Sequence, residues 1–399
     1  MIHIMFFSRR VYADYASTTP ISRKVEKAIV LNHRKGNPSA ISKEGVKAKK
    51  VLEEGRGLAA RAIQSRPEEI VFTSGGTESN NLAISGVIEK RASEGVSYEK
   101  IHIITSVIEH SSVLECLRYW EKKGVTMTYI GVNEDGIVST AEIEKAITSD
   151  TVLVSIMYAN NEIGVIEPIS EIGQMIREYR KQKEIIYPLF HTDACQAPLF
   201  LSLFRESLRT DLISLDGHKI YGPKGVGILF VKNGVKILPM LFGGGQENGL
   251  RPTTENISGI VGMSVALTEA VRNREIFSKK MQILRDLLIL KITSEFPEAI
   301  FNGSLKYRLP NNLNISFPWI QNAEFAVLWL DARGIACSTK SSCLKGEEES
   351  YVVRSLDPQD KWRARTTLRF TFGARTRRND ILRIVRTLKK LKEFLSIAK

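Results

Sequence analysis

Cysteine is scarce in this sequence, and the pattern of the few that occur argues against several kinds of site. The 399 residues include four cysteines, Cys116, Cys195, Cys337 and Cys343. No two of them form a C-x-x-C pair, which argues against a zinc ribbon and against a thioredoxin-type redox site. So few cysteines in a long chain indicate a reducing compartment, and we expect a cytoplasmic protein.

Long hydrophobic runs are also absent. No apolar stretch approaches the roughly 20 residues that a membrane-spanning helix needs, so we expect no membrane partner. The first ten residues, MIHIMFFSRR, place arginines after the apolar residues, which is the reverse of a secretory signal, and no cleavage site follows. We interpret this stretch as an N-terminal arm or strand.

The sequence lacks a concentrated basic run, although it is basic overall. The formal net charge is +13 and the pI is about 9.5. A basic balance favours polyanion partners or acidic substrates. The Lys and Arg residues are spread along the chain, however, and no basic run is interleaved with aromatic residues. We therefore expect no direct nucleic-acid function.

The pattern of what is present predicts an α/β domain. Short, almost continuous apolar runs are typical of strands buried on both faces of a sheet. These runs are EIVFTSGG, KIHIITS, TVLVSIMYANN, YPLFHTDA, DLISLDG and GVGILFV. Helical patterns lie between them, as in TESNNLAISGVIEKRASEG and PISEIGQMIREYRKQKE. Strand and helix alternate over residues 14–257, which predicts a large domain with a mainly parallel sheet.

A second, smaller α+β domain is predicted from the rest of the chain, residues 258–399 together with 1–13. It begins with one or two long helices and continues with a strand-like NNLNISFP, a helical NAEFAVLWLDARG and a strand-like TTLRFTFG. A basic amphipathic helix follows from Asp380 to about Ala398. Its apolar face suggests packing on the domain, with a solvated basic face, rather than a membrane or RNA contact.

Polar residues follow several of the predicted strands directly. In open α/β sheets the carboxyl ends of the strands form the edge where ligands bind, so these segments predict one site. In TSGGTESNN, Gly75 and Gly76 let the backbone approach a ligand, and Thr77 begins a helix whose free N–H groups suit a phosphate. A plain strand-to-helix turn explains the same pattern.

Two further segments carry ionisable side chains at strand ends. IEHSS places His110 there, where a structural role is as compatible as a catalytic one. FHTDACQA places Asp193 and Gln196 there. Because a buried carboxylate needs a partner, Asp193 either pairs with a cation or caps the next helix.

The segment SLDGHKIYGPKGVG holds Lys219 at the end of a strand, beside His218. A lysine in a tight loop suits a Schiff-base former or a general base. Taken together, a phosphate-binding helix start, an aspartate for a pyridinium nitrogen, a histidine to stack on a ring and a lysine for a Schiff base are the parts of a pyridoxal 5'-phosphate site.

These motifs resemble those of the cysteine desulfurases, a family of class V, fold type I pyridoxal phosphate enzymes. The resemblance covers nearly the whole chain and rests on motifs that occur in order: YADYASTTP, GNPSA, VFTSGGTESNN, EHSSV, NNEIGVIEP, HTDACQA, GHKIYGPKGVG, GGGQENGLRPTTEN and LRFTFG. It implies a PLP-dependent transferase fold of type I, with a mainly parallel seven-stranded sheet flanked by helices and a smaller α+β domain.

The resemblance also implies roles for single residues. Lys219 would form the Schiff base and Asp193 would keep the pyridine nitrogen protonated, while His110 would stack on the ring and move protons. Phosphate would be bound by Gly76, Thr77 and His218, and by Thr254 of a neighbouring subunit, which implies a homodimer. Gln196 and Asn161 would contact the ring oxygen and the substrate, Arg369 would clamp the substrate carboxylate, and Ala16 lies in the segment lining the substrate.

The same resemblance assigns Cys343, in CSTKSSC, as the nucleophile. Its polar loop favours a thiolate, whereas Cys116, Cys195 and Cys337 fit buried small hydrophobes. The implied reaction converts L-cysteine to L-alanine and leaves a persulfide on Cys343. Its sulfur would pass to an iron–sulfur scaffold protein or to a tRNA-thiolation partner.

Alternatives stay open from the sequence. Within enzymes they are a selenocysteine lyase or another class V PLP lyase or aminotransferase. Outside enzymes they are a non-catalytic sulfur-trafficking or RNA-binding relative, against which the intact Lys219, Asp193, His110, Arg369 and Cys343 argue.

The sequence departs from the family pattern at a few positions. Asp216 stands where relatives usually carry a serine or another small polar residue near the phosphate, and an anion there is unfavourable unless it is protonated, turned away or paired. Ser42 replaces a frequent histidine, Lys340 a common glycine, and Pro252-Thr253 the usual Ser-Gly. These departures bear on cofactor affinity, loop behaviour and partner choice.

Overall fold

The structure is a computed structural model that describes residues 9–340 and 349–397. Most of the predicted N-terminal arm therefore lies outside the described residues. The same holds for Cys343, the predicted nucleophile.

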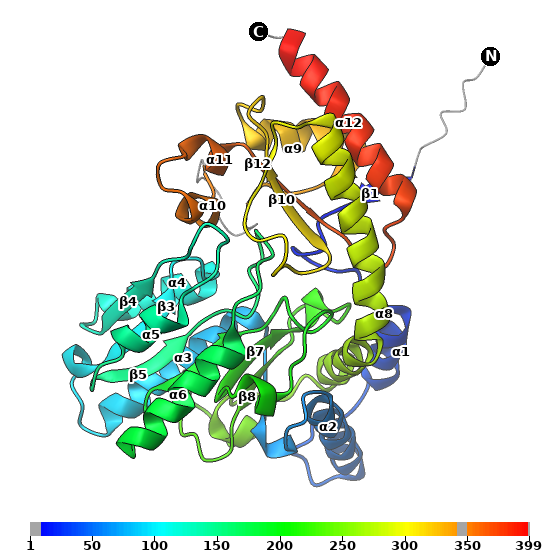
Figure 1. The fold of residues 1–399 in the computed structure, drawn as a ribbon. Coiled ribbons are helices and arrows are strands. Elements are labelled where there is room, and N and C mark those ends of the chain that lie inside the picture. Colours follow the sequence, from blue (N-terminus) through cyan, green and yellow to red (C-terminus); the bar gives the residue numbers. More distant parts are fainter. Residues whose placement is uncertain (1–8, 341–348, 398–399) are drawn as a thin grey trace.

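The large lobe of the molecule is built on one seven-stranded sheet with the order β2-β8-β7-β6-β5-β3-β4 (Figure 1). Its strands are β2 (Ile70–Thr73), β3 (His102–Ser106), β4 (Thr126–Ile130), β5 (Thr151–Ser155), β6 (Leu189–Asp193), β7 (Leu212–Asp216) and β8 (Gly227–Val231). β8 pairs antiparallel with both of its neighbours, and all other pairs are parallel. The expected seven-stranded, mainly parallel sheet is confirmed.

Helices cover both faces of this sheet. They are α1 (Arg23–Asn32), α2 (Lys43–Ala62), α3 (Gly76–Ser93), α4 (Ser111–Glu121), α5 (Thr140–Ala146), α6 (Ile169–Lys183) and α7 (Arg205–Leu208). Four 3-10 turns join the elements: η1 (Pro67–Glu69), η2 (Tyr98–Lys100), η3 (Gly217–Lys219) and η4 (Gln246–Gly249).

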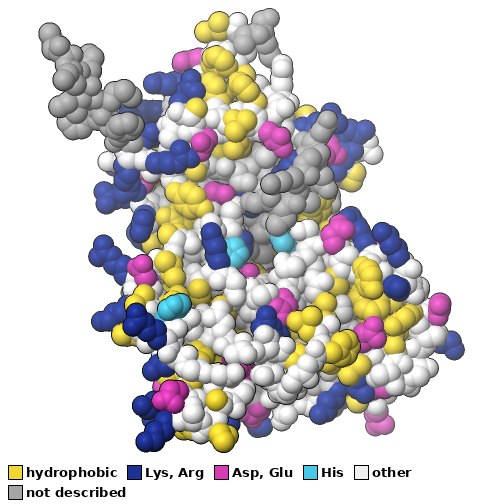
Figure 2. All heavy atoms as spheres, turned by 180° about the vertical axis from the view of Figure 1, so that it is seen from behind, with side chains coloured by type: hydrophobic (Ala, Val, Ile, Leu, Met, Phe, Trp, Pro, Cys, Tyr) yellow, Lys and Arg dark blue, Asp and Glu magenta, His cyan; other side chains and the backbone are white. Residues whose placement is uncertain are grey.

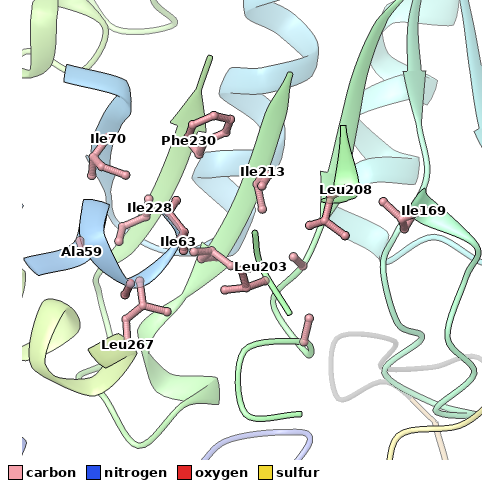
Figure 3. Close-up of a cluster of buried hydrophobic side chains, with 14 of the residues drawn as sticks. Ala59, Ile63, Ile70, Ile169, Leu203, Leu208, Ile213, Ile228, Phe230 and Leu267 are labelled. Carbon is pink, nitrogen blue, oxygen red and sulfur yellow. The ribbon is translucent and has the colours of Figure 1, made fainter. Parts of the chain in front are cut away.

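Alternate strand residues face two separate hydrophobic clusters. Ile213 of β7 packs with α2, α5 and α6 on one face, while the preceding Leu212 packs with α3 and α4 on the other. The first cluster also holds Ile228 and Phe230 of β8 (Figure 3). Burial on both faces explains why these strands are almost continuously apolar in the sequence.

The smaller lobe holds a three-stranded antiparallel sheet, β12-β10-β9, and a two-stranded parallel sheet, β1-β11. These strands are β1 (Val11–Tyr12), β9 (Ile300–Phe301), β10 (Asn312–Ser316), β11 (Ile335–Ala336) and β12 (Thr367–Thr371). Its helices are α9 (Ala323–Ala332), α10 (Tyr351–Leu356), α11 (Lys361–Arg365) and α12 (Arg378–Ile397).

One long helix, α8 (Ile257–Glu295), runs along both lobes (Figure 1). Its first half, including Leu267, joins a cluster of the large sheet. Its second half, from Met281, packs in a core with β1, β10, β12 and α12. The one or two helices expected here are thus a single helix of 39 residues. The division at residue 257 stays a prediction.

The C-terminal helix α12 packs as the sequence predicts. The apolar residues along one side of it are buried in the core of the small lobe, and these are Ile381, Ile384, Val385, Leu388 and Leu391. Figure 2 shows that Lys and Arg side chains are scattered over the back of the molecule rather than gathered in one patch. Among the described residues, no helix is long and apolar enough to cross a membrane.

Candidate active site

The polar segments predicted to form one site do meet at one edge of the large sheet. Six of its seven strands share one direction, so the ends of β2, β3, β5, β6 and β7 lie along the same edge. A cavity of about 180 Å³ opens there. Ten of the predicted site residues line it: Ala16, Gly76, Thr77, His110, Asn161, Asp193, Gln196, His218, Lys219 and Arg369.

Two predicted site residues do not line this cavity in the described part of the chain. Thr254 is exposed on the loop before α8, and its contact with another subunit stays a prediction. Cys343 falls outside the described residues.

Lys219 ends the 3-10 turn η3, directly after β7. Its Nζ donates to the carbonyl oxygens of Ala16 at 2.7 Å and of Ser17 at 2.8 Å. The turn is too tight for side chains at its glycines, since a Cβ at Gly217 would lie 2.8 Å from the Pro223 carbonyl oxygen. The packed loop therefore holds the lysine at the sheet edge instead of releasing it to solvent.

A chain of hydrogen bonds links Asp193 to His110. The Asn80 side-chain amide donates to Asp193 Oδ2 at 2.7 Å and to Ser112 Oγ at 2.9 Å. Ser112 Oγ lies 2.8 Å from His110 Nδ1, which also accepts from the Ser112 backbone N–H at 3.2 Å. Because His110 Nδ1 is an acceptor, its proton sits on Nε2. Asp193 Oδ1 accepts from the Cys195 N–H at 2.9 Å, so the carboxylate also caps the turn after β6.

Arg369, on β12 of the small lobe, reaches into the same cavity. Its side chain is 1% exposed and forms an ion pair with Asp14 at 2.8 Å. Its Nη1 donates to the Asn161 carbonyl oxygen and its Nη2 to Ser17 Oγ, each at 2.8 Å. Arg369 Nε has no hydrogen-bond partner among the described residues. The guanidinium is thus fixed in place with donor capacity left for a carboxylate.

The start of α3 also lines the cavity, through Gly76 and Thr77. Gly75 is in a backbone conformation with φ 152°, and a Cβ at Gly76 would lie 2.6 Å from Cys195 Sγ, so only glycine fits there. The Asp216 carboxylate reaches this point and accepts from the Gly76 N–H at 2.7 Å. His218 lies beside it, and burial lowers the pKa of this histidine although Asp216 acts in the opposite direction.

Two buried glutamates stand behind the site. Burial raises the pKa of Glu109, next to His110, to about 8, although Ser106 Oγ and the Met157 N–H donate to its carboxyl group. Burial also raises the pKa of Glu167 to about 8. Both carboxyl groups therefore keep a proton near neutral pH, and for Glu109 this limits the negative charge that Asp193 meets.

The three cysteines in the described part of the chain are poor nucleophiles. Burial raises the pKa of Cys116 to about 11. Burial also raises the pKa of Cys195 and of Cys337. Since the thiolate is the reactive form, these side chains behave as small hydrophobes, as the sequence predicts.

Sequence reasoning missed three residues that hold the site together: Asn80, Asp14 and Ser17. Each lies inside a motif that was recognised, TSGGTESNN or YADYASTTP. Asn80 stands one helical turn after Gly76, so it shares the face of α3 that looks onto the strand ends, and this spacing could have revealed it. Within residues 9–340 and 349–397, no three His, Cys, Asp or Glu side chains form a group that could hold a metal ion.

Comparisons with known proteins agree with this geometry. The profile of the Aminotransferase class-V family matches residues 11–384. "Cysteine desulfurase IscS" of Dictyoglomus turgidum is 40% identical over 390 residues, which cover 97% of this chain and 95% of that protein. Among solved structures, a "NIFS-LIKE PROTEIN" superposes with a TM-score of 0.87 at 34% identity, covering 97% of this chain and 100% of the other. The structure titled "SspA in complex with cysteine" does so with a TM-score of 0.76 at 32% identity, covering 91% and 98%.

Proposed function

The chain belongs to the class V aminotransferase family, and we propose that it uses this site as a cysteine desulfurase with pyridoxal 5'-phosphate. The reaction moves the sulfur of L-cysteine onto a cysteine side chain of the enzyme and leaves L-alanine. The observation that carries the proposal is the convergence of Lys219, Asp193 and His110 with Arg369 around one cavity. Similarity over nearly the whole length to proteins named cysteine desulfurases supports it.

The residues around the cavity fit the cofactor along most of its length. Lys219 would hold the aldehyde carbon, Asp193 the ring nitrogen, and His110 the ring face. Gln196 would approach the ring oxygen, and Gly76, Thr77 and His218 would surround the phosphate. When bound, the cofactor supplies an electron sink for the bonds around the substrate Cα. The exception to the fit is the Asp216 carboxylate at the phosphate end.

Arg369, Lys219 and His110 each have a distinct role in binding the substrate or moving a proton. Arg369 binds the substrate carboxylate through its remaining donors and so fixes which bond at Cα faces Lys219. Lys219 Nζ, when it is a free amine, accepts the Cα proton. The hydrogen bond at Nδ1 holds the His110 ring in one tautomer, so its Nε2 is the atom that donates or accepts a proton in the cavity.

Sulfur transfer needs a thiolate that the described cysteines do not offer. Because burial raises the pKa of Cys116, Cys195 and Cys337, they stay protonated at neutral pH. This supports the sequence-based assignment to Cys343. The Cys343 thiolate would attack the substrate sulfur, an S–S bond would form as the C–S bond breaks, and the three-carbon product would gain protons to become alanine.

The acceptor and the oligomeric state belong to the same proposal. The Cys343 persulfide would pass sulfur to an iron–sulfur scaffold protein or to a tRNA-thiolation partner. A homodimer is supported by an apolar surface beside the site, where Phe242 is 91% exposed, Leu241 51% and Met240 42%. Phe242 and Met240 line a cavity of about 1080 Å³, and two residues of the candidate site, Thr77 and His110, line it as well. A subunit covering this surface would bring Thr254 towards the neighbouring phosphate site.

The test is a reconstitution with pyridoxal 5'-phosphate followed by turnover of L-cysteine. We expect a yellow protein whose visible band is lost on borohydride reduction and which releases equal amounts of alanine and sulfide in the presence of a reductant. Lys219→Ala should abolish alanine formation, and Cys343→Ala should abolish persulfide formation. Cys337→Ala, a matched cysteine variant at a buried position, should keep both.

Three results would contradict the proposal. A protein that takes up no pyridoxal 5'-phosphate is not a cofactor-dependent desulfurase. Full catalytic activity of the Cys343→Ala variant would favour another lyase or an aminotransferase of the same family, since neither needs this cysteine. Turnover of L-selenocysteine but not of L-cysteine would favour a selenocysteine lyase.

A further inference from the structure

The Asp216 side chain lies where the site is expected to receive a negatively charged group. The N-terminus of α3 offers free backbone N–H groups and the positive end of the helix dipole, which suit a phosphate. One of these groups, the Gly76 N–H, already donates a hydrogen bond to Asp216 Oδ2 at 2.7 Å. The protein thus places a carboxylate of its own at the start of the helix.

The contacts around Asp216 hold the carboxylate in this position. Its Oδ1 accepts from the His218 N–H at 3.1 Å and lies 3.5 Å from His218 Nε2. Its Oδ2 is packed so closely that a Cβ at Gly75 would lie 3.1 Å away. Asp216 is buried, with 9% of its surface exposed. The carboxylate therefore serves as a cap for both η3 and α3.

Lys219, three residues after Asp216, has hydrogen-bond partners in another segment. Its Nζ donates to the carbonyl oxygens of Ala16 and Ser17. The Asp216 carboxylate accepts hydrogen bonds from the backbone N–H groups of Gly76 and His218. Those are the kinds of donor that a phosphate would use at this end of the cavity.

We propose that Asp216 acts as a built-in anion that competes with the phosphate of the cofactor for the start of α3. The inference rests on the proposed function for the identity of the cofactor. On binding, the phosphate either displaces the carboxylate from the Gly76 N–H or lies beside it and is repelled. In both cases the cofactor is held less tightly than the other residues of the site allow. In the absence of cofactor the same carboxylate stabilises the helix start.

The test compares ligands that differ in the phosphate alone, pyridoxal 5'-phosphate and pyridoxal. Each is titrated into cofactor-free protein, and the dissociation constant is read from the change in visible absorbance. Asp216→Asn keeps the shape of the side chain and removes the charge. We expect it to bind pyridoxal 5'-phosphate at least about tenfold more tightly than the unchanged protein, because a like charge close to the ligand is removed. Its affinity for pyridoxal should change less than about twofold, since no phosphate is involved.

Two further variants serve as controls. Asp150→Asn changes the net charge by the same amount at an exposed position and should alter neither affinity. Asp216→Ser removes the charge with a smaller side chain and should also tighten the binding of pyridoxal 5'-phosphate, which keeps the test available if Asp216→Asn does not fold. Thermal melts of the cofactor-free proteins provide a second readout. Asp216→Asn should melt below the unchanged protein, because a charged helix cap is lost.

Inorganic phosphate provides an arm that does not depend on the proposed function. At constant ionic strength, it should raise the melting temperature of Asp216→Asn more than that of the unchanged protein. Equal affinities of both proteins for pyridoxal 5'-phosphate, with tight binding in each, would overturn the competition while leaving the proposed function intact. Failure of all variants to bind either pyridoxal compound would contradict both.

Discussion

Replacing Glu109 with glutamine is expected to stabilise the protein more at alkaline pH than at acidic pH. Glu109 is fully buried between β3 and α4, and burial raises its pKa from an ordinary 4.5 to about 8. Ser106 Oγ and the Met157 N–H donate to its Oε1, whereas Oε2 has no hydrogen-bond partner among the described residues. Glutamine can keep an acceptor oxygen at the Oε1 position and is uncharged, so it resembles the protonated glutamate.

The sign of the effect follows from which state holds the proton. Below about pH 4.5 the folded and unfolded chains both carry it, and Glu109 makes no pH-dependent contribution. Between this value and about pH 8 the unfolded chain releases the proton and the folded chain keeps it, so stability falls as the pH rises. Because each tenfold change in proton affinity is worth about 1.4 kcal/mol, the loss approaches about 4 to 5 kcal/mol at the upper end. The glutamine variant escapes this loss.

Thermal melts followed by circular dichroism at about pH 5.5 and about pH 8.5 measure the difference. We expect a melting temperature several degrees above that of the unchanged protein at the higher pH, and a smaller gain at the lower one. Glu144→Gln, at an exposed position on α5, is the matched control and should show no such dependence. If the difference between Glu109→Gln and the unchanged protein were the same at both pH values, Glu109 would not be the group that titrates.

Three further predictions test the site and the surface beside it. Asn80→Ala removes the side-chain amide that donates to both Asp193 and Ser112. Since a hydrogen bond to a charged group is worth about 1.5 to 3 kcal/mol, turnover of L-cysteine should fall at least about tenfold. An unchanged rate in Asn80→Ala, or a full rate in Asn80→Ser, would contradict this positioning role. Arg369→Lys keeps the charge but loses the fork of donors, so KM for L-cysteine should rise at least about tenfold, measured in steady-state kinetics, with a smaller change in kcat. Phe242→Glu places a charge on the exposed apolar surface and should convert a dimer to a monomer in analytical ultracentrifugation, whereas Ile186→Glu, at another exposed apolar residue, should not.

The sequence predicts the framework of the large lobe because its strands are buried on both faces. Each of the six apolar runs became a strand of the large sheet. The seventh strand, β4 (Thr126–Ile130), was not found by pattern, since it lies at an edge of the sheet and its side chains are partly exposed. The resemblance to a family supplied the number of strands.

The sequence predicts those site residues that directly follow a predicted strand. Residues at strand ends, such as Lys219 and Asp193, could be assigned to one edge before the structure was known. The contacts of Asp216 and the burial of Glu109 could not, because both depend on packing between segments far apart in the chain. Gly76 and Asp216, for example, are 140 residues apart and share one hydrogen bond of 2.7 Å.

The segment 14–19 contacts residues of both lobes at the site. The carbonyl oxygens of Ala16 and Ser17 hold Lys219 of the large lobe, while Asp14 and Ser17 Oγ hold Arg369 of the small lobe. A substitution in this segment would therefore change the surroundings of Lys219 Nζ and of the Arg369 guanidinium together. A substrate carboxylate on the remaining donors of Arg369 would lie beside Ser17, whose Oγ contacts Arg369 and whose carbonyl oxygen accepts from Lys219. One short segment thus connects the guanidinium proposed to bind the substrate carboxylate with the lysine proposed to accept the Cα proton.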